Sequence, residues 1–124
     1  MLKFSSPLYP AVSMGVVVAG CVGFKESLGW EERRLLIDRI KDALELPRDA
    51  DSIGYGAFSE KVEGRIYYFC HVDWRSRFDE ERVEALIREI GDKVMDYEIA
   101  LYHLNSGVYF FKDSRTGEDV VREI

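Results

Sequence analysis

The sequence of 124 residues contains no glutamine and a single asparagine, Asn105, beside 17 Lys and Arg residues and 23 Asp and Glu residues. Proteins that work at high temperature avoid thermolabile side-chain amides and carry many charged residues that form ion-pair networks. The composition therefore predicts a thermophilic protein. We expect its melting temperature to lie above the range of about 45–65 °C that is usual for mesophilic domains.

Cysteine is also scarce, since the chain has only Cys21 and Cys70. Two cysteines are too few for the disulfide framework of a small secreted domain, and they lack the paired spacing of a zinc site. Both lie inside apolar runs, which favours two small buried side chains. The alternative is a disulfide, because intracellular proteins of thermophiles can form them. No metal site and no cofactor is expected.

Long hydrophobic runs are missing, because no stretch reaches the roughly 20 apolar residues that a membrane-spanning helix needs. We therefore expect no membrane partner. The segment Val18-Ala19-Gly20-Cys21, together with Lys3, resembles a bacterial lipoprotein signal, in which the cysteine is acylated. Pro7 and Pro10 interrupt the apolar stretch that such a signal requires, so the expected location is the cytoplasm.

A basic surface is not indicated either, since the formal net charge is −6. Affinity for nucleic acid comes largely from clustered Lys and Arg, so nucleic acid is not expected as a partner. A chain of this length can bury enough surface for one hydrophobic core without metal or disulfide support. We expect residues 1–124 to form a single α+β domain.

The order of the hydrophobic periods is the most informative feature that is present. Period-2 and fully apolar runs predict strands at 12–24, 53–62, 65–73, 97–104 and 108–112. Helical spacing predicts one helix from Ser27 or Gly29 to Leu46 and a second that begins after Asp79 as N-cap. Residues 114–124 fit either a further strand or a short helix.

This β-α-β-β-α-β order is typical of the ferredoxin-like fold, a two-layer sandwich in which two helices cover one face of an antiparallel sheet. The strand at 12–24 is then expected between the strands at 65–73 and 97–104. An additional C-terminal strand or hairpin extends the predicted sheet.

The strand at 65–73 presents two different sets of side chains, because successive side chains point to opposite faces. One face carries Tyr67, Phe69, His71 and Asp73, and the other carries Ile66, Tyr68, Cys70 and Val72. We expect the second set to face the helices. Tyr67, Phe69 and Tyr102 then form an aromatic surface on the uncovered face. A soluble domain seldom leaves such a surface bare, so a homo-oligomer is predicted, with a dimer favoured.

Polar residues near the end of the same strand indicate a second candidate region. The predicted rim is composed of His71, Asp73, Trp74, Arg75, Arg77 and His103. Arginine forks bind carboxylate or phosphate and tryptophan offers a stacking face, so a small-molecule ligand is possible here. This gives the alternative function, a small-molecule enzyme or sensor. The competing interpretation is a solvated helix entrance, in which Arg75 and Arg77 pair with the acids that follow.

Two catalytic interpretations of this region are not favoured by strand geometry. Neighbours on a strand point apart, so His71 cannot activate Cys70 as a nucleophile. His71, Asp73 and His103 have the chemistry of a metal site, but the first strand is expected to separate the two histidines by about 10 Å. No catalytic residue and no metal ligand is therefore predicted, and the function stays open.

Two short segments resemble known families. Residues 20–25, Gly-Cys-Val-Gly-Phe-Lys, resemble the phosphate-binding loop of acylphosphatases, but Lys25 stands where that family has arginine, and the only asparagine lies in a distant turn. The activity is therefore not expected. Residues 64–69, Gly-Arg-Ile-Tyr-Tyr-Phe, are similar to the third strand of the RNA-recognition motif, with Tyr67 and Phe69 as its outward aromatics. The partner aromatic on the first strand is missing.

Overall fold

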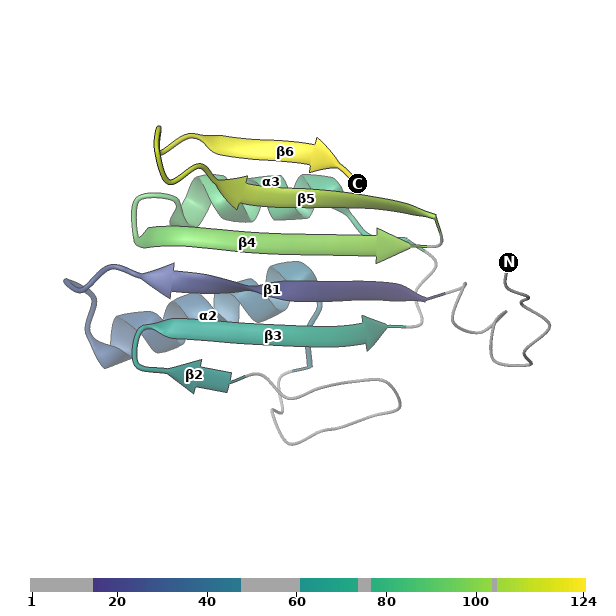
Figure 1. Cartoon of the computed structure of the whole chain (residues 1–124). Helices are drawn as coiled ribbons and strands as arrows, with labels where there is room; N and C mark the ends of the chain where they lie inside the picture. Colours follow the sequence, from purple (N-terminus) through teal and green to yellow (C-terminus); the bar gives the residue numbers. More distant parts are fainter. Residues whose placement is uncertain (1–14, 48–60, 74–76, 104) are drawn as a thin grey trace.

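The structure is a computed structural model that describes residues 15–47, 61–73, 77–103 and 105–124. Within them, one six-stranded sheet carries two helices, so the protein is α+β as predicted. The elements in chain order are β1 (Val16–Phe24), α2 (Trp30–Leu44), β2 (Lys61–Glu63), β3 (Ile66–Asp73), α3 (Glu80–Ile90), β4 (Val94–His103), β5 (Ser106–Lys112) and β6 (Asp119–Glu123). Across the sheet the strands follow the order β2-β3-β1-β4-β5-β6 (Figure 1).

β1 lies inside the sheet and pairs antiparallel with β3 on one side and β4 on the other. These are the neighbours that the sequence predicted for it. Val18 stands opposite His71 of β3 and Leu101 of β4, whereas the next residue, Ala19, stands opposite Cys70 and Ala100. Because directly paired residues point to the same side of a sheet, these two rows define its two faces.

Both helices lie on one face of the sheet (Figure 1). The side chains of β1 that face them, Val16, Val18 and Val22, are buried in the core. Asp79 is the N-cap of α3, as predicted, and accepts hydrogen bonds from the backbone N–H groups of Glu81 and Arg82. The other face, which we call the open face, carries Val17, Ala19 and Cys21 of β1, and no described helix covers it.

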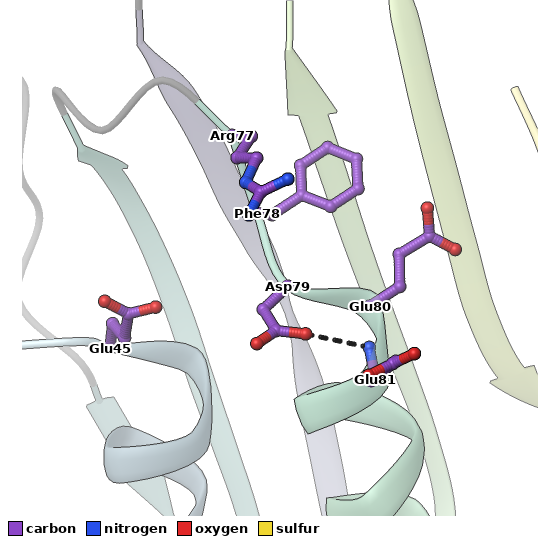
Figure 2. Close-up of a pocket in the computed structure, with 6 residues that line it drawn as sticks. All are labelled: Glu45, Arg77, Phe78, Asp79, Glu80 and Glu81. Atoms are coloured by element: carbon purple, nitrogen blue, oxygen red, sulfur yellow. Dashed lines mark hydrogen bonds between the residues drawn. The ribbon is translucent and has the colours of Figure 1, made fainter.

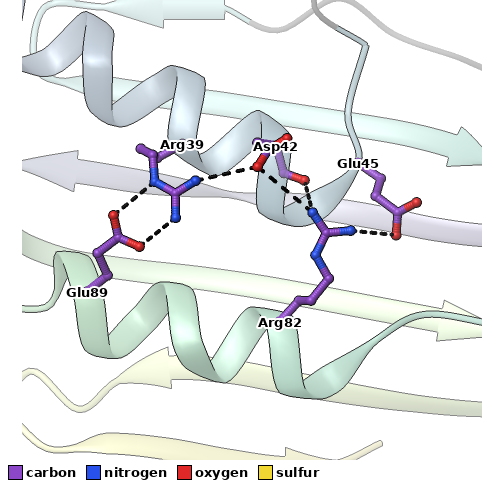
Figure 3. A network of polar contacts seen from close by, with 5 residues as sticks. All are labelled: Arg39, Asp42, Glu45, Arg82 and Glu89. Carbon is purple, nitrogen blue, oxygen red and sulfur yellow. Dashed lines mark hydrogen bonds and ion pairs between the residues drawn. The ribbon is translucent and has the colours of Figure 1, made fainter.

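The outer surfaces of the two helices are joined by ion pairs (Figure 3). The Arg39 guanidinium donates two hydrogen bonds to the Glu89 carboxylate, at 2.9 Å from Nε and 2.6 Å from Nη2. Arg82 of α3 lies 3.4 Å from Glu45 and donates a hydrogen bond to the backbone carbonyl of Asp42. This network is the kind that the amide-poor composition predicted, although the thermophilic origin itself stays a prediction.

The C-terminal residues form a strand, which decides between the two alternatives left by the sequence. After β5, Asp113 accepts a hydrogen bond from the N–H of Arg115, and Gly117 adopts a positive φ of 75° that favours glycine. β6 then pairs antiparallel with β5. The Tyr97 hydroxyl donates a hydrogen bond to Asp119 at 2.8 Å, which ties β6 to β4. Of the strand predicted at 53–62, residues 53–60 lie outside the described part.

Candidate functional site

The structure places the two histidines of the predicted rim on the same face but not side by side. His71 stands opposite Val18 and His103 opposite Val16, so both belong to the row that faces the helices. β1 lies between them, which corresponds to about 10 Å across two strand spacings. Both side chains are half-buried. The predicted separation of the histidines agrees with this register.

The remaining rim residues do not join the histidines within the described structure. Trp74, Arg75 and the side chain of Asp73 lie outside the described part. Arg77 lines a pocket of about 560 Å³ at the start of α3, together with Phe78 and four carboxylates (Figure 2). One of these, Asp79, is occupied as the helix N-cap. Arg77 and these acids are exposed, as in the competing interpretation of a solvated helix entrance, but within the described residues no ion pair joins Arg77 to them.

The prediction that Tyr67 and Phe69 form the exposed interface is wrong. Tyr67 has no exposed surface and Phe69 is 5% exposed, because their partners Val22 and Gly20 belong to the helix-facing row of β1. Their rings pack together with centroids 5.6 Å apart inside the core. The two faces of β3 are therefore the reverse of those expected. The same burial removes the aromatic pair on which the resemblance to the RNA-recognition motif depended.

Tyr102, the third predicted interface residue, does lie on the open face and is 42% exposed. It belongs to a row that crosses one end of the sheet, which we call the apolar end. The members of this row are Val72, Val17, Tyr102, Gly107 and Ile124. The next row contains Cys70, Ala19 and Ala100 and continues through Tyr109 to Arg122. A shallow groove of about 500 Å³ runs over the two alanines, with Glu98, Tyr102, Tyr109 and Ile124 along its sides.

The rest of the open face, from the row of Tyr109 and Arg122 to Asp96, has a different character. We call it the charged corner, and its members are Asp96, Glu98, Tyr109, Phe111 and Arg122. The Tyr109 hydroxyl donates a hydrogen bond to Glu98 at 2.5 Å, and this bond raises the pKa of Tyr109 to about 12. Tyr109 stacks on Phe111 at 4.8 Å, and the Arg122 guanidinium lies 5.4 Å from the centre of the Phe111 ring.

Both cysteines lie on the open face, half-buried and without a disulfide. Partial burial, together with the nearby carboxylates of Glu98 and Asp96, raises the pKa of the Cys21 thiol. A protonated thiol is a poor nucleophile, so Cys21 is held in its unreactive form. Cys70 pairs with Ala19 and Cys21 with Tyr68, so the two cysteines are diagonal neighbours on adjacent strands. Deep burial, which the sequence favoured for them, is not observed.

Comparison with known proteins assigns no function to these regions. No family model, no curated protein and no solved structure matches the chain. In the described ranges, no three His, Cys, Asp or Glu side chains are grouped so that they can hold a metal ion. The described helices are also too short or too polar to cross a membrane.

The charged corner was missed by the sequence analysis, although a signal for it exists. In the strand after α3, Tyr97, Ile99 and Leu101 alternate with Glu98, a charge that cannot face the core without a partner. Glu98 therefore marks the open side of β4. To find that Cys21 and Phe111 lie beside Glu98 requires the strand register, which cannot be obtained from the sequence alone.

Proposed function

We propose that this chain is a ferredoxin-like domain that works as a homodimer, with two copies packed through the open faces of their sheets. The observation that carries the proposal is the apolar end, where Val17, Tyr102 and Ile124 lie in one row with no charged side chain between them. Tyr102 is 42% and Ile124 is 58% exposed in the single chain. The position of β1 between β3 and β4, with both helices on one face, supports the ferredoxin-like arrangement.

The size of the open face is sufficient for a stable dimer. It spans about 24 Å across six strands and about 26 Å along the eight residues of β3, a flat footprint of about 600 Å². A standard interface removes about 800 Å² of accessible surface from each partner. Side chains that stand on a sheet expose more surface than their flat footprint, so an interface over most of this face reaches that class, and one confined to the apolar end is smaller.

The distribution of charge on the open face favours contact at the apolar end. The carboxylate of Asp96 stands at the other end, where it can stay hydrated when the apolar rows are covered. Glu98 also lines the groove over the alanines, where its carboxylate accepts a hydrogen bond from Tyr109. Each copy has a net charge of −6, so two copies repel each other at long range. Salt screens this repulsion. The proposed dimer is therefore expected to be tighter at moderate ionic strength than at low ionic strength.

Light scattering coupled to size-exclusion chromatography tests this proposal. The wild-type chain is expected to elute with twice the mass of one chain, and Tyr102→Glu to elute as a monomer, because the new carboxylate would have to be buried without a partner. Leu35→Glu is the matched control. Leu35 is 55% exposed on α2, on the other side of the molecule, so this variant is expected to remain dimeric.

A folded wild-type chain that stays monomeric at high micromolar concentration would overturn the proposal. It would equally fail if Leu35→Glu dissociated the dimer while Tyr102→Glu did not, since the contact would then lie on the helix layer. Circular dichroism of each variant shows whether a change in mass comes from loss of folding.

A further inference from the structure

A pocket of about 420 Å³ lies at the charged corner, and its lining comes from one chain. β4 contributes Asp96 and Glu98, β6 contributes Arg122, and the aromatic rings of β5 lie between these strands. The turn after β5 adds Asp113 and Arg115 to the lining. The pocket shares no lining residue with the row of the apolar end. Glu98 and Tyr109 also line the groove over the two alanines, so the pocket borders the surface on which the proposed dimer depends.

Opposite charges face each other across this pocket without meeting. β5 separates β4 from β6, so the backbones that carry the acids and the arginine are about 10 Å apart. No ion pair joins Arg122 to Asp96 or Glu98 anywhere in the described residues, in contrast to the helix surface, where Arg39 and Glu89 pair at 2.6 Å. The Arg122 guanidinium instead lies over the ring of Phe111, 5.4 Å from its centre.

The hydrogen bonds around the pocket leave these charged groups available. Tyr109 donates to one carboxylate oxygen of Glu98, and no described residue donates to the other. Asp96 lies over the bare backbone of Gly23, where a Cβ would come within 2.5 Å of its carboxylate oxygen. Lys112 also lines the pocket, but it donates to the carbonyls of Gly91 and Val94 near the end of α3.

We propose that this pocket binds a small aromatic zwitterion of amino-acid size, with its ammonium group on Glu98 and Asp96, its carboxylate on Arg122 and its apolar body on Phe111. An ammonium group complements the two carboxylates, and a guanidinium recognises a carboxylate with two parallel hydrogen bonds. The stacked rings of Tyr109 and Phe111 offer an apolar surface between the two charges. The pocket, of about 420 Å³, is large enough for a molecule of this size.

Binding of L-phenylalanine, measured by calorimetry and by amide chemical shifts, tests this inference against two matched probes. Phenethylamine lacks the carboxylate and 3-phenylpropionate lacks the ammonium group. L-phenylalanine is expected to bind at least about tenfold more tightly than either probe, because each charge-assisted contact adds to affinity. The shifts should fall on β4, β5 and β6. The titration is repeated in Tyr102→Glu, so that its result does not depend on association.

Two variants test which charged side chains bind the ligand, and a third is the control. Arg122→Gln should remove the preference for L-phenylalanine over phenethylamine, and Glu98→Gln, which keeps an acceptor for Tyr109, should reduce the preference over 3-phenylpropionate. Arg34→Gln on the outer surface of α2 is the control and should change neither preference. The inference is overturned if L-phenylalanine does not saturate the protein, if all three probes bind equally, or if Arg122→Gln and Glu98→Gln both keep the wild-type selectivity.

Discussion

The two faces of the sheet differ in what they bury, although similar residues supply them. On the helix-facing side, Tyr67 and Phe110 have no exposed surface. Their immediate neighbours, Tyr68 and Phe111, lie on the open face, where Tyr68 is 41% exposed. Because these neighbours have the same side chain, the difference between the faces comes from the helices and not from residue type. Adjacent positions in one strand thus act as matched probes of core and surface.

The largest loss of stability is expected from a substitution on the helix-facing side of the sheet. Tyr67→Ala should lower the free energy of unfolding by about 3–5 kcal/mol, since it leaves a cavity in the core. Tyr68→Ala should change it by about 0.5 kcal/mol or less in the Tyr102→Glu background, where association does not contribute. Urea denaturation followed by circular dichroism measures both. Equal losses from the two variants would contradict the assignment of the faces.

The sequence was sufficient for the two helices and for the neighbours of β1, but it left β6 undecided and gave the wrong orientation of β3. Its alternation divides the strand into two sets correctly, yet both sets are apolar, and Tyr67 and Tyr68 have no difference in hydropathy. Which set meets the helices depends on the pairing with β1, where the buried row holds Val16, Val18 and Val22. That register is set by contacts between residues far apart in the chain, so local patterns cannot supply it.

The candidate sites show how far strand order alone can predict which residues come together. The strand order was enough to predict that His71 and His103 are separated, and the structure agrees. The charged corner, in contrast, brings together β4, β5 and β6, of which the last was undecided between strand and helix. A site made from three strands requires two registers, and neither is visible in a single sequence.

Two glycines of β1 allow the two faces of the sheet to be compared at the level of the backbone. At Gly20 an added Cβ would lie 1.9 Å from the backbone oxygen of Glu98, whereas at Gly23 its one close contact, at 2.5 Å, would be the carboxylate of Asp96 on the open face. Backbone in the middle of a sheet cannot move aside easily, but a side chain can. Gly20→Ala should therefore cost about 1–3 kcal/mol of stability, and thermal denaturation should show Gly23→Ala close to wild type.

Gly23→Ala also provides a link to the proposed ligand. The variant displaces Asp96 without removing a charge, so we expect a folded protein in which L-phenylalanine binds more weakly.

The stability prediction for Gly20 has its own contradicting outcome. A Gly20→Ala variant as stable as wild type would show that β1 and β4 are not packed as closely as described.

The thiol of Cys21 reports on the electrostatics of the open face. Its pKa is raised by partial burial, with further contributions from Glu98 and Asp96. In a Cys70→Ala background, Glu98→Gln should lower this pKa, and the rate of alkylation by iodoacetamide near pH 8 should increase because more thiolate is present. The pH dependence of the rate measures the shift. An unchanged or higher pKa would indicate that Glu98 does not face Cys21.

The smallest effect is expected on the outer surface of the helices, where charged side chains remain in water. Arg39 lowers the pKa of Glu89, so the pair contributes stability above the pKa of a free glutamate and loses it as the pH falls through the lowered value. Because both side chains are about half exposed, Arg39→Gln should cost only about 0.2–1 kcal/mol near neutral pH. High salt or acid should make the difference in urea midpoint between variant and wild type disappear. A salt-independent loss would instead mean that the arginine stem stabilises the helix pair by packing, so that even this hydrated layer would belong to the core side of the molecule.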